Sequence, residues 1–328
     1  MIISKTPLRA SLFGGGTDFR DYYENATGGY GSVLSAALDM HVYITVNKKF
    51  DDMIRVVYNG NELVSSVDEV KHNIIREALK LVGIDKGIEI IYMADLPMSG
   101  AGIGLASSSA LAVGVLNALH AFKGEFVTPE QLAREACHIE IDCIGQRIGI
   151  QDQFAVAHGG FHRYRFQNDG TVTVTPVLMK KEIRDRLFSR LLLFFTGNTR
   201  DSKKILNEQS DTIAQKSRML DDLVETVDKV YEELAMGNLD YVGTQLDRTW
   251  QIKKQFAGGV SNEQIDSMYK TAKAAGAVGG KILGAGGGGF MLLYVPEEKQ
   301  TAVREAMKEY REVEFKVDAQ GSRIIFVD

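Results

Sequence analysis

Three glycine-rich windows hold the residues of this sequence that are best placed to bind a ligand. Of the 33 glycines in 328 residues, thirteen fall within residues 14–16, 100–104 and 279–289. Glycine has no Cβ, so such a window lets backbone N–H groups approach a ligand closely, and phosphate is the ligand that most often uses this. The alternative is three unrelated turns. The residues beside each window decide between the two interpretations.

The second window is followed by three serines, Ser107–Ser109, at the expected start of an apolar helix over 107–122. Unpaired N–H groups and the positive end of a helix dipole together make an anion site, and a serine hydroxyl can also ligate a phosphate-bound Mg²⁺. The sequence contains no G-x-x-x-x-G-K-[ST] pattern, which excludes a Walker A loop. The simpler alternative is that the serines only cap the helix.

The third window, 284–289, formally matches the dinucleotide-binding pattern G-x-G-x-x-G. That pattern needs a strand before the glycines and a helix after them, whereas here a helix-like segment precedes and the strand-like segment 290–295 follows. Dinucleotide binding is therefore not expected. Five glycines in six positions instead favour a close approach of this loop to another backbone or to a ligand.

Two acidic residues are candidates for chemistry: Glu140 lies within the helix expected over 128–144, and Asp152 lies in a polar cluster at 151–153 that apolar residues bound on both sides. One carboxylate that holds Mg²⁺ and another that accepts a proton from a hydroxyl group are what phosphoryl transfer needs beside a phosphate site. Asp152 could instead be an ordinary helix N-cap. Zinc templates fail, because no P-C-x-x-C accompanies His138-x-Glu140 and the pair His158 and His162 lacks an H-E-x-x-H glutamate.

Composition restricts the class of protein. With 38 Lys and Arg against 43 Asp and Glu the formal net charge is −5, so no overall positive field attracts nucleic acid or anionic lipid. Apolar residues at 45% are typical of a chain that folds throughout. Cys137 and Cys143 are expected to be reduced thiols. No signal peptide is recognised and no segment reaches 18 apolar residues, so a cytoplasmic protein without a membrane span is expected.

Helix-like and strand-like segments alternate without a regular βαβ order, which predicts an α+β fold. The length favours two lobes, which we place at residues 1–175 and 176–328, with the functional site in the cleft between them. Helices are expected at 67–82, 107–122, 128–144, 262–275 and 297–310, with helical periodicity through 201–236. Strands are expected at 1–4 and 9–13, on either side of a turn, and at 41–47, 88–93, 161–166, 171–177, 191–195, 290–295 and near 324–325.

Three segments together resemble the signature motifs of one kinase superfamily. Residues 7–18 resemble its first motif, 97–110 resemble P-x-x-x-G-L-G-S-S-A, and 281–289 resemble K-[IL]-[TS]-G-A-G-G-G-G, in the same order and at similar separations. The chain is thereby identified as a member of the GHMP superfamily, named after galactokinase, homoserine kinase, mevalonate kinase and phosphomevalonate kinase. The resemblance implies an N-terminal lobe like ribosomal protein S5 domain 2, a ferredoxin-like C-terminal lobe, and ATP with Mg²⁺ in the cleft.

The resemblance also implies roles for single residues. Asp152 would be the catalytic base, Arg9 would neutralise charge on the transferred phosphoryl group, and Ser108 with Glu140 would hold Mg²⁺. The residues implied at the nucleotide are Gly102, Gly104, Ala106, Ser107, Ser108 and Ser109, and those implied at the acceptor are Gly15, Gly16, Thr17, Asp18, Arg200, Gly286 and Gly287.

The chain departs from the superfamily pattern at two places. Residues 98–103 lengthen the phosphate loop, and Ala106 stands where the superfamily has glycine. The stretch Gly-Gly-Gly-Thr-Asp at 14–18 replaces the Gly-Glu-His of galactokinases, so galactose is not expected as the acceptor. This stretch and F-T-G-N-T-R at 195–200 are instead similar to the branch formed by bacterial D-glycero-D-manno-heptose 7-phosphate kinases.

Membership of that branch implies that ATP phosphorylates the C1 hydroxyl of a heptose 7-phosphate, giving a heptose 1,7-bisphosphate for nucleotide-activated heptose and surface polysaccharide. Arg200 with Lys203 or Lys204 could meet the 7-phosphate, or could be a solvated helix start. The alternatives are a kinase for a fucose- or galactose-type sugar, a kinase for a mevalonate-type substrate, and a catalytically silent sugar- or nucleotide-binding member. A sugar phosphate and ATP are the expected partners, without nucleic acid or membrane, and a homodimer is left open.

Overall fold

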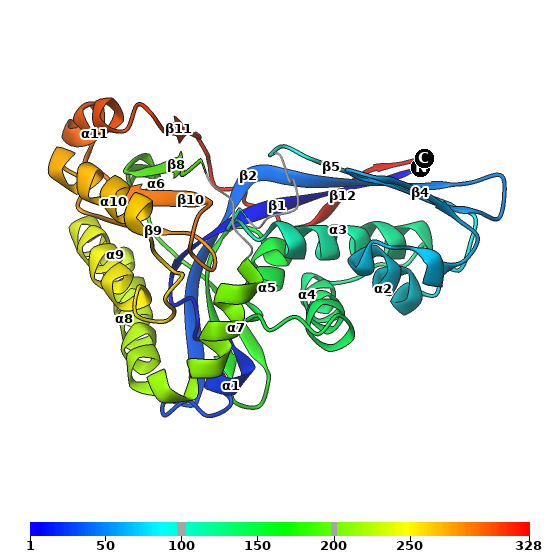
Figure 1. Cartoon of the computed structure of the whole chain (residues 1–328), viewed down its shortest axis with the longest axis horizontal. Helices are drawn as coiled ribbons and strands as arrows, with labels where there is room; N and C mark the ends of the chain where they lie inside the picture. The colour runs from blue at the N-terminus through cyan, green and yellow to red at the C-terminus, as the bar shows by residue number, and fades with distance from the viewer. Residues whose placement is uncertain (97–102, 198–201) are drawn as a thin grey trace.

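The computed structural model describes residues 1–96, 103–197 and 202–328, and these form two lobes, each built on its own sheet (Figure 1). The strands of the larger sheet are β1 (Ile2–Phe13), β2 (Tyr30–Lys48), β3 (Ile54–Val57), β4 (Asn61–Val64), β5 (Ile88–Ala94), β6 (Phe161–Gln167), β7 (Val172–Pro176) and β12 (Arg323–Val327). Their order is β12-β1-β2-β5-β3-β4, with β6 beside β2 and β7 beside β6. The smaller sheet contains β8 (Leu191–Phe195), β9 (Gly279–Ile282), β10 (Phe290–Tyr294) and β11 (Arg311–Glu312), in the order β11-β8-β10-β9.

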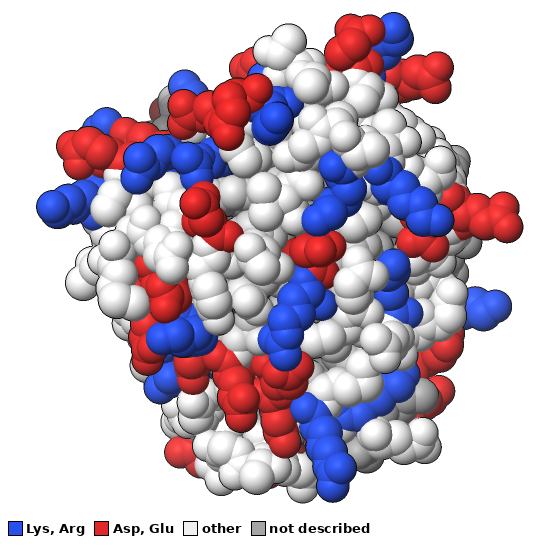
Figure 2. Space-filling model, turned by 90° about the vertical axis from the view of Figure 1, so that its left-hand side faces the viewer, with Lys and Arg blue, Asp and Glu red and all other residues white. Residues whose placement is uncertain are grey.

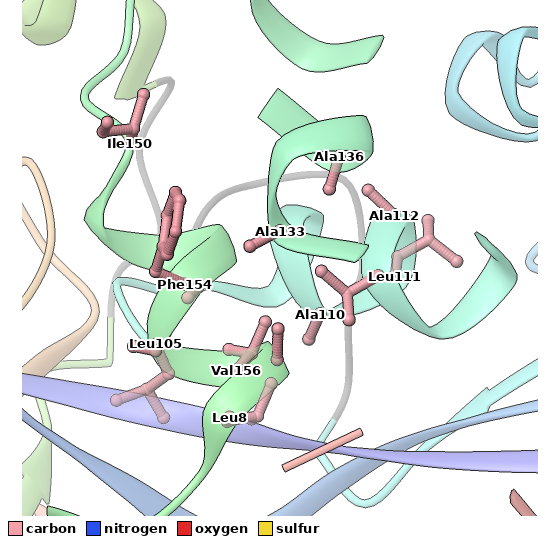
Figure 3. Close-up of a cluster of buried hydrophobic side chains, with 14 of the residues drawn as sticks. Leu8, Leu105, Ala110, Leu111, Ala112, Ala133, Ala136, Ile150, Phe154 and Val156 are labelled. Atoms are coloured by element: carbon pink, nitrogen blue, oxygen red, sulfur yellow. The ribbon is translucent and has the colours of Figure 1, made fainter. Parts of the chain in front are cut away.

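Helices cover one face of the larger sheet: α2 (Asn73–Val82), α3 (Ser107–Phe122), α4 (Pro129–Cys137) and α5 (Gln151–His158) (Figure 1). Helix α3 is buried without a break from Ser109 to His120, because it packs against both the sheet and the neighbouring helices. Figure 3 shows part of this core, in which side chains from α3, α4, α5 and β1 meet around Ala110, Leu111, Ala133, Phe154, Val156 and Leu8. Burial of each large apolar side chain stabilises the lobe by about 1.5–3 kcal/mol.

The smaller sheet is covered by helices of the C-terminal half: α6 (Lys181–Ser189), α9 (Leu239–Lys253), α10 (Glu263–Ala275) and α11 (Gln300–Ala306). Its core is a separate apolar cluster that includes the fully buried Trp250 of α9 and Met291 of β10. Helices α1 (Arg20–Tyr23) and α7 (Ser202–Thr212) lie lower in Figure 1, below this sheet.

Two acidic side chains of helix α8 (Ser217–Met236), Asp221 and Asp228, form contacts between the two lobes. The Tyr30 hydroxyl donates a hydrogen bond to Asp228 Oδ2 at 2.7 Å, and Arg165 Nη2 lies 3.0 Å from the same oxygen. About two helical turns before Asp228 on α8, Asp221 Oδ1 accepts a hydrogen bond from the Tyr22 hydroxyl at 2.6 Å. The lobes are therefore packed against each other rather than joined only through the chain.

The end of the chain returns to the larger sheet. Strand β12 pairs antiparallel with β1, from Ile2 opposite Val327 to Lys5 opposite Arg323. The amide of Asp328 donates to the Met1 carbonyl at 3.0 Å, and Figure 1 shows both ends of the chain together at the far right.

Several of the expected elements differ in the structure. The turn expected between residues 4 and 9 is wrong, since β1 runs unbroken through Pro7. Proline fits there because the register with β2 shifts between Pro7 and Leu8, and such a bulge tolerates a residue without an N–H. The helical stretch 201–236 is broken into α7, a 3₁₀ turn and α8, and the helix expected at 297–310 shortens to a 3₁₀ turn and α11. Helices α6 and α9 and strand β9 were not predicted.

The surface carries both signs of charge. On the face shown in Figure 2, which is the left-hand side of Figure 1, Lys and Arg lie among Asp and Glu without a broad area of one sign. Cys137 and Cys143 are both free thiols, as expected. Across the described segments, no helix is long and apolar enough to cross a membrane.

Candidate active site

A cleft between the two lobes collects side chains from both. The N-terminal lobe lines it with β1, the starts of α3 and α5 and the first glycine window, and the C-terminal lobe adds the end of α9 and the third glycine window. Its empty volume is about 1010 Å³ when the part open to solvent is included. Clefts at such junctions between lobes are common places for small-molecule sites. The cleft therefore lies where the sequence predicted it.

Arg9 and Asp152 form a fixed pair on the floor of the cleft. Arg9 Nε donates to Asp152 Oδ1 and Arg9 Nη2 donates to Asp152 Oδ2, each at 2.8 Å, while Nη1 donates to the Gly104 carbonyl at 2.7 Å. Such a two-pronged contact orients both partners. Arg9 is only 3% exposed, whereas the Asp152 side chain is 26% exposed. The exposed side of the Asp152 carboxylate therefore faces the cleft. Asp152 does not cap α5, because the N-cap of that helix is Ile150.

Glu140 lies at the back of the cleft, fully buried, on a π-helix (His138–Cys143) that continues α4. Its carboxylate accepts hydrogen bonds from Ser109 Oγ at 2.8 Å, from Gln153 Nε2 at 2.6 Å and from the Ser108 hydroxyl. Burial raises the pKa of Glu140, and these neutral donors oppose that rise. A π-helical turn inside a helix often marks a functional position.

The residues implied to hold Mg²⁺ fit that ion. Ser108 and Glu140 offer hydroxyl and carboxylate oxygens on the wall of the same cleft, and Mg²⁺ prefers oxygen ligands. All the hydrogen-bond donors to the buried Glu140 carboxylate are neutral, so a cation there would balance its charge. The described residues contain no group of three or more His, Cys, Asp or Glu that could hold a metal. Phosphate oxygens and water would have to complete the shell, as is usual for Mg²⁺.

The N-terminus of α3 opens into the cleft, and no side chain of the described residues caps it. Ser108 and Ser109 give their hydroxyls to Glu140 rather than to the helix backbone, so the alternative that they only cap the helix is wrong. The N–H groups of the first turn are left for an anion. Ala106 precedes them with φ 63° and ψ 35°, in the left-handed region, where glycine carries no steric cost. That conformation explains why the superfamily has glycine at this position.

The second and third glycine windows touch each other. A Cβ added to Gly104 would lie 2.4 Å from the Leu283 carbonyl oxygen, and one added to Gly284 would lie 2.5 Å from Gly104 Cα. A Cβ on Gly289 would lie 2.4 Å from the Ile103 carbonyl oxygen. The expectation of a close approach to another backbone is confirmed, and the windows are not unrelated turns. The two lobes meet here, backbone against backbone.

Asp18 is a second carboxylate on the cleft wall, and it is only 2% exposed. Its Oδ1 accepts from the Gly16 amide at 2.9 Å and its Oδ2 from the Gln151 amide at 3.2 Å. Burial raises the pKa of Asp18, and the negative charge of Asp152 raises it further. A Cβ on Gly149 would lie 1.9 Å from Asp18 Oδ2, so this glycine is needed to seat the carboxylate.

The remaining residues implied by the resemblance divide into three groups. Gly15, Gly16 and Gly286 line the cleft, as do Ala106 and Ser107. Gly102 and Arg200 lie outside the described residues, and so does the side chain of Lys203.

Two residues implied at the acceptor face away from the cleft. Thr17 is fully buried, and its hydroxyl donates to the Gly14 carbonyl at 2.8 Å and lies 2.9 Å from the Ser32 carbonyl. It therefore fixes the shape of the first glycine window. Gly287 is absent from the cleft wall, and its amide donates to the Val260 carbonyl at 2.9 Å.

Sequence reasoning missed two buried lysines near the cleft. Lys253 of α9 lines the cleft at 9% exposure, and Lys281 lies behind it at 4%. A signal for Lys253 was present, because it continues the apolar stripe formed by Leu246 and Trp250 at helical spacing. A lysine on the core-facing stripe of a helix is unusual enough to indicate a function.

Comparisons with known proteins agree with this geometry. The GHMP kinases N terminal domain matches residues 70–160, and the GHMP kinases C terminal domain matches residues 204–312. The D-glycero-alpha-D-manno-heptose 7-phosphate kinase of Campylobacter jejuni is 30% identical over 323 aligned residues, which cover 94% of each chain.

Two solved structures share the fold. A D-glycero-D-manno-heptose 1-phosphate kinase from Bacteroides thetaiotaomicron superposes with a TM-score of 0.81 at 24% identity, over 100% of both chains. A Lactococcus lactis galactokinase complexed with galactose superposes with a TM-score of 0.76 at 21% identity, over 98% of this chain and 94% of the other. The match in sequence and fold extends over nearly the whole length, and the chain belongs to the GHMP kinase family as a phosphotransferase with an alcohol acceptor.

Proposed function

We propose that this protein is an ATP- and Mg²⁺-dependent sugar kinase that phosphorylates the C1 hydroxyl of a heptose 7-phosphate, giving a heptose 1,7-bisphosphate. The observation that carries the proposal is the pair of carboxylates on one cleft wall. Asp152 is oriented by Arg9 and open to the cleft, and Asp18 is seated by two backbone amides. One carboxylate suits a proton acceptor, and the other suits a partner for sugar hydroxyls.

Two further points support a sugar as the acceptor. Polar side chains surround Asp18 in the cleft, among them Ser11, Gln151 and Lys253, whereas a mevalonate-type substrate would call for an apolar pocket. The Campylobacter jejuni relative is a heptose 7-phosphate kinase, and the similarity covers 94% of both chains. These points favour a heptose phosphate over the fucose- and galactose-type alternatives.

The nucleotide would lie with its phosphates at the N-terminus of α3. The free N–H groups of the first turn, preceded by the left-handed Ala106, face the anion, and the backbone around Gly104 approaches it without a side chain. Ser108 and Glu140 would hold Mg²⁺, which when bound neutralises phosphate charge during the transfer.

Asp152 accepts the proton of the sugar hydroxyl. Both carboxylate oxygens already accept a hydrogen bond from Arg9, but each keeps a lone pair, and the exposed edge faces the cleft. As the sugar oxygen bonds to the γ-phosphorus and the bond to the β-phosphate oxygen breaks, the hydroxyl proton passes to Asp152 and ADP leaves. The guanidinium of Arg9 stays beside the reacting atoms, where its positive charge stabilises the charge that develops.

Turnover on a sugar panel tests the proposal. Free and phosphorylated heptoses and hexoses, with mevalonate beside them, are incubated with ATP and Mg²⁺, and products are followed by phosphorus NMR together with ATP consumption. A new anomeric phosphate resonance with heptose 7-phosphate is the expected result. Turnover only with galactose, fucose or mevalonate would overturn the acceptor assignment, and no ATP consumption with any acceptor would indicate a catalytically silent binding protein.

The variant Asp152→Asn tests the base. Turnover should fall by about 10²- to 10⁴-fold, the usual contribution of a general base. ATP binding, measured by calorimetry, should stay near the wild-type value, and this also checks that the variant folds although Arg9 loses its counter-ion. Asp142→Asn is the matched control, because Asp142 pairs with His138 at the exposed end of the π-helix. Retained activity in Asp152→Asn would sink the base assignment.

A further inference from the structure

The C-terminal end of α9 brings a buried ammonium group into the cleft. Lys253 Nζ donates a hydrogen bond to the Gly284 carbonyl at 2.5 Å, and this is its one hydrogen bond within the described part of the chain. An ammonium group has three donors, so two remain. Because Lys253 is 9% exposed and lines the cleft, those two donors can reach a bound ligand more readily than bulk water.

Two further cations near Lys253, Arg9 and Lys281, are already engaged. Arg9 is held by Asp152 and the Gly104 carbonyl, and Lys281 donates to the Ser11 carbonyl at 2.8 Å from behind the cleft. Lys253 is close enough to Arg9, Asp18 and Asp152 to feel their charges. Its ammonium is therefore within electrostatic range of both Asp152 and Asp18, and it keeps two donors that no described residue accepts.

Two buried polar atoms in the same cleft as Lys253 have no hydrogen-bond partner among the described residues. Ser11 Oγ and Gln151 Oε1 make no hydrogen bond within the described residues, although Ser11 is 4% and Gln151 is 8% exposed. Both side chains line the cleft on either side of Gly15, where an added Cβ would lie 3.7 Å from Ser11 Oγ and 3.6 Å from Gln151 Nε2. Unpaired buried polar atoms in native structures call for a partner. A ligand with several hydroxyl groups, each both donor and acceptor, would satisfy them.

We propose that Lys253 is an acceptor-binding residue, whose ammonium donates hydrogen bonds to hydroxyl oxygens of the sugar while Ser11 and Gln151 bind neighbouring oxygens of the same molecule. The inference rests on the proposed function, because it needs a polyhydroxylated acceptor. It adds a buried cation of the C-terminal lobe to the acceptor residues Gly15, Gly16 and Asp18 of the N-terminal lobe. The two competing outcomes are that Lys253 contacts only ATP, or that it only stabilises the folded protein.

A pH profile separates a bound ammonium from a structural lysine. Burial, and after it the positive charge of Arg9, lower the pKa of Lys253 to about 8. The charged groups that face it are Arg9, Asp18, Asp152 and Lys281. The ammonium is lost as pH rises through the pKa, so kcat/KM for the acceptor should fall above about pH 8. In Lys253→Arg the cation persists, and this fall should disappear.

The experiment compares Lys253→Met, Lys253→Arg and Ser11→Ala with the control Lys254→Met. Lys254 is the next residue on the chain and pairs with Asp266 in a more exposed position. Lys253→Met should raise the acceptor KM about tenfold or more while the KM for ATP stays near wild type, since a hydrogen bond from a charged donor is lost. Lys253→Arg should recover part of the affinity at neutral pH. Ser11→Ala removes an unpaired hydroxyl, so it should raise the acceptor KM without lowering the free energy of unfolding.

The outcomes distinguish this inference from the proposed function. Wild-type turnover with heptose 7-phosphate tests the function, and the ratio of variant to wild type on whichever sugar the wild type phosphorylates tests Lys253. Equal acceptor KM in Lys253→Met and Lys254→Met would overturn the inference, and so would a parallel rise in the KM for ATP. If Lys253→Met does not fold, an unchanged acceptor KM in Ser11→Ala together with an unchanged pH profile in Lys253→Arg overturns it.

Discussion

The contact between the second and third glycine windows can be tested by adding a single methyl group. Gly104→Ala places a Cβ 2.4 Å from the Leu283 carbonyl oxygen and 2.9 Å from its carbon, at a residue whose φ is +83°. Gly83→Ala is the matched control, because Gly83 has a similar φ of +72° at the end of α2 but nothing within 4 Å of the added Cβ. The two variants share the conformational cost and differ only in the contact between lobes.

The expected magnitudes follow from this geometry. A side chain in the left-handed region costs about 1–2 kcal/mol, and both variants carry that cost. Gly104→Ala adds an overpacking cost of about 1–3 kcal/mol, because the obstacle is backbone rather than a flexible side chain. An ordinary contact needs about 3.4 Å, so the windows must separate by ~1 Å. Since the Gly104 carbonyl accepts from Arg9, the separation also moves the Arg9–Asp152 pair, and a misplacement of ~1 Å can lower a rate about 10²-fold.

Urea unfolding and steady-state kinetics measure the two effects on the same preparations. Gly104→Ala should lose more unfolding free energy than Gly83→Ala and should show a large fall in kcat, whereas Gly83→Ala should keep its kcat. Equal unfolding free energies and equal kcat in the two variants would refute the reasoning, because the contact between the windows would then contribute neither to stability nor to the positioning of Arg9.

The remaining predictions concern the metal side of the cleft. In Glu140→Gln the Mg²⁺ concentration for half-maximal activity should rise about tenfold or more, because the charged oxygen beside Ser108 is lost. A Mg²⁺ titration of the activity measures this concentration. An unchanged Mg²⁺ requirement would exclude Glu140 as a ligand. Ala106→Gly should stay active with an unfolding free energy within about 1 kcal/mol of wild type, whereas Ala106→Val should lose about 2 kcal/mol or more, because a β-branched residue fits the left-handed region poorly. Similar stability in both Ala106 variants would mean that the left-handed conformation is not required.

The local sequence predicted those helices and strands whose apolar residues reflect burial of the whole element. Helix α3 begins and ends at the expected residues because its apolar run packs on all sides, and β8 follows an uninterrupted apolar run in the same way. The pairing of Arg9 with Asp152 could be expected only through the family resemblance, because 143 residues separate them along the chain. Their contact depends on the sheet that brings β1 beside α5.

The missed features depend on tertiary contacts that a local pattern does not contain. A turn was expected between residues 4 and 9, whereas β1 continues through Pro7 because its register with β2 shifts between Pro7 and Leu8. The π-helix at Glu140 leaves no mark in the helical periodicity of residues 128–144. The family resemblance implied Thr17 at the acceptor, but the Thr17 hydroxyl donates its hydrogen bond to the Gly14 carbonyl. Lys253 was not predicted as a site residue, because an isolated lysine in a sequence usually indicates a solvated surface charge.

The pairing of β1 with β12 has a consequence for how the chain is made. Ile2 and Val327 are 325 residues apart, so β1 is synthesised long before its partner strand β12. The smaller sheet draws its strands from residues 191–312 and can assemble while β1 still presents an open edge. Closure of that edge is a late, long-range event, and such contacts form slowly. Until β12 has been made, the nascent protein carries an unpaired strand edge of the kind that promotes misassembly and chaperone binding.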